Sequence, residues 1–489
     1  MAIWLIIGAL LILFYLWKVI QDNRSLPPGP MGLPVVGSLP WFNSGPEYAK
    51  KLADKYGPIV SVKLGRRFVV YLNDYETVRE AFIDQGEIFA GRFPLGPVVQ
   101  SNDDSLGVVW SEGDTWRLLR RFTLSSMRDF GLGKMSIEGK IHAELEHFVE
   151  ELQAMNGQPF DPLILLTNAV SNITCNIIFG KRFDYDDPDF KHIIEFLSKE
   201  VVNKSAVRST LNFLPWLRIF PQYEREVKKR HRNRDKLYEF YSKQIEEHKK
   251  TREPGSPARD FLDAMLDEAA QEHDKGKIFD KHLMITINQL FIAGTETTAT
   301  TLQWALYYLI KDPQLQAKLQ HHVDQATGST HWASWQDRTS LPLVESFVLE
   351  VQRTGNIASL SLPHANTKET TIKGYRIPAR SMIFANLTNL HYDPKYWGTD
   401  AEEFVPDRFV NKNGKGGVNS RADSFMPFST GKRVCLGESL ARMEMFIFVA
   451  GLLQRYNFRK AEGETLREGR TYGLTVHPMP YQLVAVPRN

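Results

Sequence analysis

The sequence predicts a mainly α-helical protein with small β-sheets, preceded by a single N-terminal transmembrane helix. Between about residue 75 and residue 360, apolar residues recur at helical spacing, and helices are predicted at 76–85, 139–155, 163–179, 225–251 and 281–311. Residues 58–72 instead alternate over two short runs, which predicts one hairpin. Residues 2–17 carry no charge and with Val19 and Ile20 approach the roughly 20 apolar residues that cross a bilayer.

Composition excludes several classes of protein. With 489 residues, 43% hydrophobic and 24% charged, the chain is globular and not disordered. Its net charge of +3 gives no reason to expect a nucleic-acid partner. The two cysteines, Cys175 and Cys435, are too few for a disulfide framework, so a reducing compartment is expected. Cys175 lies in an apolar periodic stretch and is predicted to belong to the core.

Three segments organise the chain. Residues 1–20 are predicted to be a membrane anchor, because neither a basic n-region nor a small-residue cleavage site is present. Lys18 and Arg24 follow the apolar run, which places the rest of the chain on the cytoplasmic side of the membrane. Residues 21–37 form a proline-rich hinge. Residues 38–489 are expected to form one globular domain.

The loop around Cys435 suits a metal-bound thiolate. A helical pattern starts just after the cysteine, so Cys435 is expected at a helix N-terminus, where N–H groups favour an anion. Arg433 adds a cation, and Gly431 and Gly437 allow a tight backbone path. For an isolated intracellular cysteine the alternative is a buried structural residue in a glycine-rich turn.

Five fixed positions decide between these alternatives. Phe428, Gly431, Arg433, Cys435 and Gly437 match the pattern Phe-x-x-Gly-x-Arg-x-Cys-x-Gly. The chain therefore resembles the cytochrome P-450 superfamily, whose haem-binding loop has this pattern. The resemblance implies a cytochrome P-450 fold enclosing a buried haem b (iron protoporphyrin IX), with Cys435 as the axial ligand of the iron.

The stretch 288–301 breaks the rules of helix composition, since glycine and threonine are poor helix formers. Ala293, Glu296, Thr297 and Thr300 recur at helical spacing and are expected on one face. Small residues allow a flat cofactor to approach, and a hydroxyl beside an acid can hold water and pass protons. The stretch matches the superfamily's Ala-Gly-x-Glu/Asp-Thr motif. Glu296 and Thr297 are therefore the predicted catalytic residues, and Ala293 is a predicted cofactor contact.

Further residues match contacts of the haem propionates in the superfamily. Trp116 and Arg120 stand four residues apart and share one helix face. Arg92 and His364 match two more propionate positions. Without the resemblance, the first pair would be read as part of an ordinary basic amphipathic helix.

Glu350 and Arg353, at i and i+3, form a pair that is worth only about 0.2–0.5 kcal/mol if exposed. The resemblance adds Arg408 as a third member and assigns the set a folding role.

The closing segment, residues 472–481, is most similar to the microsomal animal family 2 group. That similarity implies a monooxygenase of the endoplasmic reticulum membrane, acting on an apolar lipid, steroid, terpenoid or xenobiotic by hydroxylation or epoxidation. Electrons would come from NADPH through NADPH–cytochrome reductase, with cytochrome b5 as a second candidate donor, at a basic face that includes Arg121, Lys432 and Arg442.

Two other functions stay open at this point. One is a haem-thiolate isomerase or dehydratase that acts on hydroperoxides without a reductase. The other is a haem sensor or electron carrier. The acid and alcohol at 296 and 297 favour the monooxygenase over both.

Overall fold

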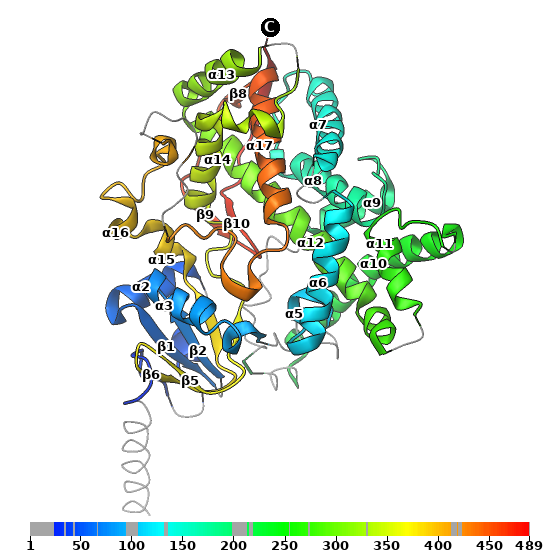
Figure 1. Ribbon diagram of the computed structural model, residues 1–489. Helices are drawn as coiled ribbons and strands as arrows, with labels where there is room; N and C mark the ends of the chain where they lie inside the picture. The colour runs from blue at the N-terminus through cyan, green and yellow to red at the C-terminus, as the bar shows by residue number, and fades with distance from the viewer. Residues whose placement is uncertain are drawn as a thin grey trace, which may run out of the picture. The chain divides into compact units, whose positions relative to one another are not determined.

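The structure is a computed structural model that describes most of the chain (Figure 1). The described residues are 24–33, 36–42, 45–65, 67–93, 106–131, 135–197, 213–214, 219–253, 255–271, 274–328, 331–411, 418 and 423–488. The predicted anchor at residues 1–20 lies outside them, as do parts of the predicted hinge. Within these ranges, no helix combines enough length with enough apolarity to pass through a bilayer.

The chain divides into two compact units, of which the first comprises Met1–Phe93, Leu360–Leu390 and Ser429–Val434. Its helices and strands are α2 (Pro46–Tyr56), β1 (Ile59–Leu64), β2 (Arg67–Leu72), α3 (Tyr75–Arg79), β3 (Gly91–Arg92), β4 (His364–Ala365), β5 (Thr370–Ile372), β6 (Tyr375–Ile377), β7 (Met382–Ala385) and most of α15 (Leu387–Tyr392). The helix predicted at 76–85 is α3 followed by a π-helical turn, Glu80–Asp84.

A five-stranded sheet in the order β1-β2-β7-β4-β3 forms the centre of the first unit. The predicted hairpin is confirmed, since β1 and β2 pair antiparallel with Ile59 opposite Leu72. Strand β7 joins β2 in parallel, and β4 and β3 continue the sheet antiparallel. This order leaves β1 at one edge of the sheet and β3 at the other.

Part of the predicted hinge lies along the β1 edge. Ser61 in β1 donates its backbone N–H to the Pro28 carbonyl at 2.8 Å and its hydroxyl to the Pro27 carbonyl at 2.6 Å. A Cβ at Gly29 would collide with the carbonyl oxygen of Ser61, so only glycine fits there. This stretch of the hinge is therefore attached to the sheet.

The second unit comprises Pro94–Ser359, His391–Phe428 and Cys435–Asn489. Its helices are α5 (Gly107–Trp110), α6 (Gly113–Asp129), α7 (Ser136–Ala154), α8 (Pro162–Ile178), α9 (Pro188–Phe196), α10 (Pro221–Thr251), α11 (Phe261–Ala269), α12 (Asp274–Lys311), α13 (Pro313–Thr327), α14 (Pro342–Gly355), α16 (Pro394–Trp397) and α17 (Glu438–Arg455). Strands β8 (Tyr456–Lys460) and β11 (Leu483–Pro487) pair with each other, as do β9 (Arg470–Tyr472) and β10 (Val476–Pro478). The predicted fold class, mainly α with small sheets, is confirmed.

Helices α8, α12, α14 and α17 form the core of the second unit (Figure 1). Helix α8 is apolar around most of its circumference and is almost entirely buried, as expected for such a helix. Within it, Cys175 is fully buried as predicted, and burial raises the pKa of its thiol well above the usual value. Helix α12 begins at Asp274 and not at Lys281, because Phe279 already packs into the core despite its polar neighbours.

The glycine inside α12 serves helix packing. A Cβ at Gly294 would lie 2.8 Å from Oγ1 and 3.2 Å from Cγ2 of Thr174 in α8. Real side chains do not approach that closely, so the two helices require glycine here. The sequence suggested that this glycine lets a cofactor approach, whereas the structure shows it facing another helix.

The pair Glu350–Arg353 in α14 is fully buried, which corrects the expectation for an exposed pair. Arg353 donates Nε and Nη2 to the two carboxylate oxygens of Glu350 at 2.8 and 2.7 Å. Its remaining N–H groups donate to the carbonyl oxygens of His391, Ala401 and Glu403 at 2.6 to 2.7 Å. Arg408 Nε lies 3.4 Å from Glu350 Oε1. This set fixes the irregular segment after α15 onto α14, the folding role expected of it.

Candidate functional site

The cysteine loop places Cys435 where α17 begins. The backbone N–H of Cys435 donates to the Phe428 carbonyl at 3.1 Å, and Gly437 is the N-cap of α17. The N–H groups of Gly437 and Glu438 hydrogen-bond to the cysteine sulfur, which is the direction in which free donors at a helix N-terminus point. The predicted position of Cys435 at a helix N-terminus is confirmed.

The surroundings of Cys435 both raise and lower the pKa of its thiol. Burial is the largest effect and raises the pKa of the Cys435 thiol. The N–H groups of Gly437 and Glu438 and the guanidinium of Arg120 lower it, but they do not overcome burial. The thiolate therefore needs a further positive charge at the sulfur, and a bound metal ion supplies such a charge.

Open space adjoins the sulfur. Cys435 is exposed although the protein around it is dense enough to raise its pKa, so the sulfur can be reached from one side. A Cβ at Gly437 would meet no atom within 4 Å. A soft, accessible sulfur donor fits a cofactor that carries iron.

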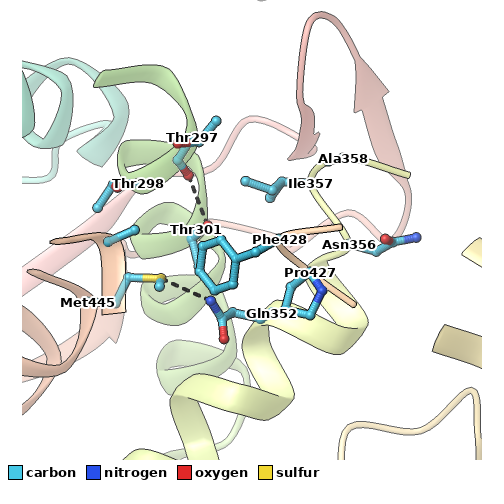
Figure 2. Close-up of a pocket in the computed structure, with 11 residues that line it drawn as sticks. Thr297, Thr298, Thr301, Gln352, Asn356, Ile357, Ala358, Pro427, Phe428 and Met445 are labelled. Atoms are coloured by element: carbon cyan, nitrogen blue, oxygen red, sulfur yellow. Dashed lines mark hydrogen bonds between the residues drawn. The ribbon is translucent and has the colours of Figure 1, made fainter. Parts of the chain in front are cut away.

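A pocket lies between α12, α14 and α17 (Figure 2). Its lining residues are Thr297, Thr298, Thr301, Gln352, Asn356, Ile357, Ala358, Pro427, Phe428, Ala441 and Met445. Helix α12 contributes hydroxyl groups, and α17 and the loops contribute mainly apolar side chains. Phe428, whose carbonyl accepts from Cys435, is among them, so the pocket adjoins the cysteine loop.

The structure separates the predicted acid and alcohol on α12. Thr297 is half-buried, lines the pocket, and donates its hydroxyl to the Ala293 carbonyl at 2.8 Å. The carboxylate of Glu296 is buried, with Oε1 lying 2.7 Å from Thr475 Oγ1 and 2.9 Å from His477 Nε2. Glu296 therefore points toward the segment that leads into β10, which corrects the expectation that it shares a face with Thr297. Ala293 is exposed on α12.

Sequence reasoning missed the partners of Glu296. Thr475 and His477 lie 179 and 181 residues away along the chain, and Gln303 meets His477 Nδ1 at 3.0 Å through Oε1. Thr300 joins them, with its hydroxyl 3.1 Å from that of Thr475. The available signal was a histidine inside a short apolar strand, where a charged or polar side chain needs a partner.

A second buried acid, Glu444 in α17, was also missed. Burial raises the pKa of Glu444 to about 8, and a hydrogen bond with Thr298 of the pocket wall partly opposes that shift. Its Oε1 lacks a hydrogen-bond partner among the described residues. At neutral pH this carboxyl is therefore mostly protonated. In the sequence it resembles an ordinary charge on a helix.

Helix α6 brings the predicted pair Trp116 and Arg120 together. Trp116 is buried, and the Arg120 guanidinium lies 5.9 Å from the centre of its indole ring. Desolvation lowers the pKa of Arg120, and the charge of Cys435 opposes that shift. Arg117 instead forms an exposed ion pair with Asp114 at 2.6 Å, so the two faces of α6 differ as expected.

The first unit brings Arg92, His364 and Arg433 together. Arg92 in β3 is paired with His364 in β4, and Arg433 Nε donates to the Ala90 carbonyl at 2.8 Å. All three are buried. Burial, followed by the charges of Arg92 and Arg433, holds the pKa of His364 well below its usual value. Two buried guanidinium groups around a neutral histidine favour an anionic ligand such as a carboxylate.

Gly431, near the start of the cysteine loop, occupies a position that only glycine fits. Gly431 has φ of +75°, and a Cβ there would collide with the Phe82 carbonyl. The ring of Phe82 stacks on that of His364 at 4.1 Å. The fixed glycine of the cysteine loop therefore has a packing reason in the first unit.

A mainly helical fold, an accessible cysteine sulfur at a helix N-terminus and an adjoining pocket are the features of a haem enzyme. The family model for cytochrome P450 matches residues 27–485, so the chain belongs to the cytochrome P450 family.

Curated relatives agree with this assignment. The chain is 38% identical to cytochrome P450 2J2 of Homo sapiens over 470 residues, which cover 95% of this chain and 92% of that protein. It is 36% identical to cytochrome P450 2C23 of Rattus norvegicus over 97% of this chain and 96% of the relative. For cytochrome P450 2E1 of Oryctolagus cuniculus the identity is 34%, over 99% and 98%. The protein is thus a cytochrome P450 monooxygenase similar to family 2, with haem b as its cofactor.

Proposed function

We propose that Cys435 binds the haem iron and that the enzyme inserts one atom of O₂ into an apolar small molecule. The observation that carries this proposal is the accessible Cys435 sulfur, which accepts hydrogen bonds from the N–H groups of Gly437 and Glu438 at the start of α17. An anionic sulfur so placed supplies electron density to iron. The catalytic domain, residues 38–489, follows an anchor at 1–20 and a hinge at 21–37.

Other residues hold the cofactor in this proposal. Arg92, Trp116, Arg120, His364 and Arg433 bind the haem carboxylates. Arginine is suited to this task because its fork of N–H groups matches a carboxylate. The neutral ring of His364 already donates its Nδ1 hydrogen to the Phe89 carbonyl at 2.8 Å, so it lies beside Arg92 and Arg433 without adding a charge.

The flat face of the cofactor needs small or planar neighbours. Ala293 offers a methyl group on the exposed side of α12, and Gly437 leaves open space beside the sulfur. Phe428 presents a ring next to the cysteine loop, with the Arg442 guanidinium 5.1 Å from its centre. These three residues complete the proposed cofactor contacts.

When bound, the haem supplies the site at which O₂ is bound and activated. The protein's own task is to bring protons and to exclude excess water. Thr297 holds a hydroxyl at the pocket wall, anchored on the Ala293 carbonyl. Glu296, one residue earlier, holds an ionisable group behind it. We assign Thr297 the positioning of the proton at the pocket and Glu296 the supply of that proton.

The substrate is an apolar molecule such as a lipid, steroid, terpenoid or xenobiotic. Ile357 and Ala358 supply apolar surface next to the hydroxyl of Thr297, and sites that are mainly apolar with a few polar groups bind such ligands. The pocket of Figure 2 itself, with about 30 Å³, has room for a water and not for the substrate. Hydroxylation and epoxidation are the expected outcomes.

Electrons come from NADPH through NADPH–cytochrome reductase, and cytochrome b5 is a second donor. The reaction takes place at the endoplasmic reticulum membrane, with the catalytic domain facing the cytosol. Of the cations assigned to the docking face, Lys432 pairs with Glu87 at 2.9 Å and Arg442 with Glu438 at 2.9 Å. Arg121 on α6 is the third. The Lys432 pair is exposed, so a redox partner could replace Glu87 with its own acidic group at little cost, whereas the Arg442 pair is partly buried.

The test of the iron ligand is the absorption spectrum of the reduced, haem-loaded protein with carbon monoxide. A spectrum of thiolate-ligated haem is expected for the wild type. Cys435→His should give the spectrum of histidine-ligated haem, while Cys175→Ser serves as the matched cysteine control and should leave the spectrum unchanged. A histidine-type spectrum from the wild type would overturn the proposal.

The test of the reaction is its dependence on electrons. Product should form from an apolar substrate only when NADPH and reductase are both present, with one O₂ consumed per product. Conversion of a hydroperoxide without either component would instead support an isomerase or dehydratase.

A further inference from the structure

The buried cluster around Glu296 contains a base that the proposed function does not use. Glu296 and His477 are 1% and 2% exposed, and Oε1 lies 2.9 Å from Nε2. On the other side of the ring, Nδ1 lies 3.0 Å from Gln303 Oε1. The backbone carbonyl of Gln303 in turn accepts a hydrogen bond from the Tyr481 hydroxyl at 2.6 Å, which ties this part of α12 to the segment after β10. Both nitrogens of the imidazole thus have a hydrogen-bond partner.

These contacts determine how many protons the pair holds. An amide oxygen only accepts, so His477 Nδ1 carries a hydrogen toward Gln303. In a neutral ring Nε2 is then an acceptor, and so is the carboxylate of Glu296. Two acceptors do not approach to 2.9 Å without a hydrogen between them. One proton therefore lies on the Glu296–His477 contact, either on an imidazolium nitrogen or on a carboxylic acid oxygen.

Two acidic groups lie around the ring. The Glu296 carboxylate faces it from α12, and Asp161, the N-cap of α8, lies near enough to His477 for the two side chains to interact. Thr475 supports Glu296 with a hydrogen bond of 2.7 Å. The Tyr481 hydroxyl, whose pKa burial raises well above its usual value, stays neutral and donates to α12.

We propose that His477 is the positioning residue for Glu296 and shares one proton with it. While the proton is on Nε2, an ion pair holds the carboxylate against the segment of Thr475 and His477, away from the hydroxyl of Thr297. Transfer of that proton to Oε1 breaks the N–H bond, forms the O–H bond and turns two charges into two neutral groups. The neutral acid is held less tightly and can turn toward Thr297.

This inference rests on the proposed function in one respect. Glu296 affects turnover only if it supplies protons behind Thr297, as proposed above. The location of the proton between Glu296 and His477 is a separate matter, and it is measured without turnover. Two experiments therefore separate the failure of one idea from the failure of the other.

The first experiment locates the proton in the haem-loaded full chain labelled with ¹⁵N-histidine, with Glu296→Gln used to assign the His477 signals by NMR. We expect the wild-type ring to carry a hydrogen on Nδ1 and to share one at Nε2. In Glu296→Gln the shared proton should be lost, which leaves a neutral ring protonated on Nδ1 alone. A wild-type ring with a bare Nδ1, or ring signals that Glu296→Gln does not shift, would overturn the proposal.

The second experiment measures peroxide released per product formed, between pH 6.5 and 8.5. His477→Gln keeps a hydrogen-bond donor but carries no mobile proton, so we expect roughly tenfold more peroxide per product and a changed pH profile. Tyr481→Phe is the matched control, because it removes a buried hydrogen bond to the Gln303 backbone next to the pair and leaves the contacts of Glu296 and His477 in place. Its peroxide released per product should stay within about twofold of the wild type.

A double-variant cycle separates positioning from a merely structural role. In the Glu296→Gln background, His477→Gln should raise the peroxide released per product by less than about twofold, because His477 acts through Glu296. Independent, multiplicative effects would overturn the proposal, as would equal uncoupling by Tyr481→Phe. If the wild type forms no NADPH-dependent product, the proposed function fails, and the NMR result alone then decides the role of His477.

Discussion

Two buried glutamates in the second unit show how differently the fold uses the same side chain. Glu350 in α14 is paired with Arg353, and all hydrogens of that guanidinium are directed at Glu350 or at backbone carbonyls. Glu296 in α12 is paired with His477, whose other nitrogen meets an amide. Both carboxylates are almost fully buried. The difference lies in the base.

Arginine does not give up its proton in proteins, whereas histidine does so near neutral pH. The Glu350 pair therefore has no base that can pass a proton, which suits a fixed structural joint. In the Glu296 pair the charge can disappear when a proton moves by less than one ångström between nitrogen and oxygen. The partner, arginine or histidine, thus distinguishes a static pair from one that can take part in proton transfer. Burial is the same in both pairs and does not distinguish them.

Breaking the fixed pair should have the largest effect. Arg353→Gln leaves the Glu350 carboxylate buried without its partner, which costs about 3–5 kcal/mol of the free energy of unfolding. We expect little soluble, haem-loaded protein, measured by yield and by urea denaturation. Arg376→Gln, which removes an exposed pair with Glu369, should change stability by less than about 1 kcal/mol. Equal effects of the two variants would contradict the assigned role.

A third buried carboxyl, Glu444, has no basic side chain among the groups that shift its pKa. The pH dependence of stability should therefore distinguish it from Glu350 and Glu296. Its folded pKa of about 8 lies above the usual 4.5, so the folded state retains a proton that the unfolded chain has lost. Its contribution to stability is complete below about pH 4.5 and is lost as the pH rises through 8, with a slope of about 1.4 kcal/mol per pH unit between these values.

The variant Glu444→Gln imitates the protonated carboxyl and should remove that slope. The difference in free energy of unfolding between variant and wild type should grow from pH 5 to pH 8, as measured by urea denaturation. Exposed Glu462 provides the control, and Glu462→Gln should leave the pH profile as it is. A wild-type profile that rises over this range would contradict the protonated state of Glu444.

The helix α12, which carries Glu296, packs closely against α8 at Gly294 and Thr174. Gly294→Ala places a methyl group 2.8 Å from Thr174 Oγ1, and overpacking of this kind costs about 1–3 kcal/mol, partly offset by the better helix propensity of alanine. Thermal unfolding should show the loss, and Thr174→Ala should restore most of it in the double variant. Additive effects of the two changes would argue against this contact.

The smallest effect on stability should come from Thr297→Ala, which touches neither buried pair. It removes a pocket hydroxyl and should raise peroxide released per NADPH by roughly tenfold, a loss of proton delivery without a loss of fold. Thr297→Ser retains the hydroxyl and should stay near the wild type. Unchanged coupling in Thr297→Ala would remove Thr297 from the proposed proton path.

The sequence predicted best what depends on neighbours in the chain. The five positions of the cysteine loop stand within ten residues, so their pattern, the start of α17 and the place of Cys435 could be inferred together. The same holds for Trp116 and Arg120, one helical turn apart. The five predicted helices and the hairpin followed from periodicity, apart from the polar first turns of α12, whereas the short strands β3 to β11 were not predicted.

Contacts across long separations were not accessible. Helical spacing put Glu296 and Thr297 on one face, but the direction of the carboxylate is set by Thr475 and His477, far along the chain. The i, i+3 pair Glu350–Arg353 looked exposed because its other acceptors are backbone carbonyls, which leave no mark in a sequence. The state of Glu444 likewise depends on burial, which its helical pattern did not reveal.

The attachment of Pro27 and Pro28 to Ser61 has a consequence for handling the protein. An open edge strand readily pairs with another chain and so promotes aggregation, and this short proline stretch covers β1 at Ser61 with two hydrogen bonds. Shortening the chain up to residue 23 leaves that cover in place. Deletion through residue 30 would expose β1 at Ser61, although Ser38 would still cover its end at Lys63, and should make the protein more prone to self-association.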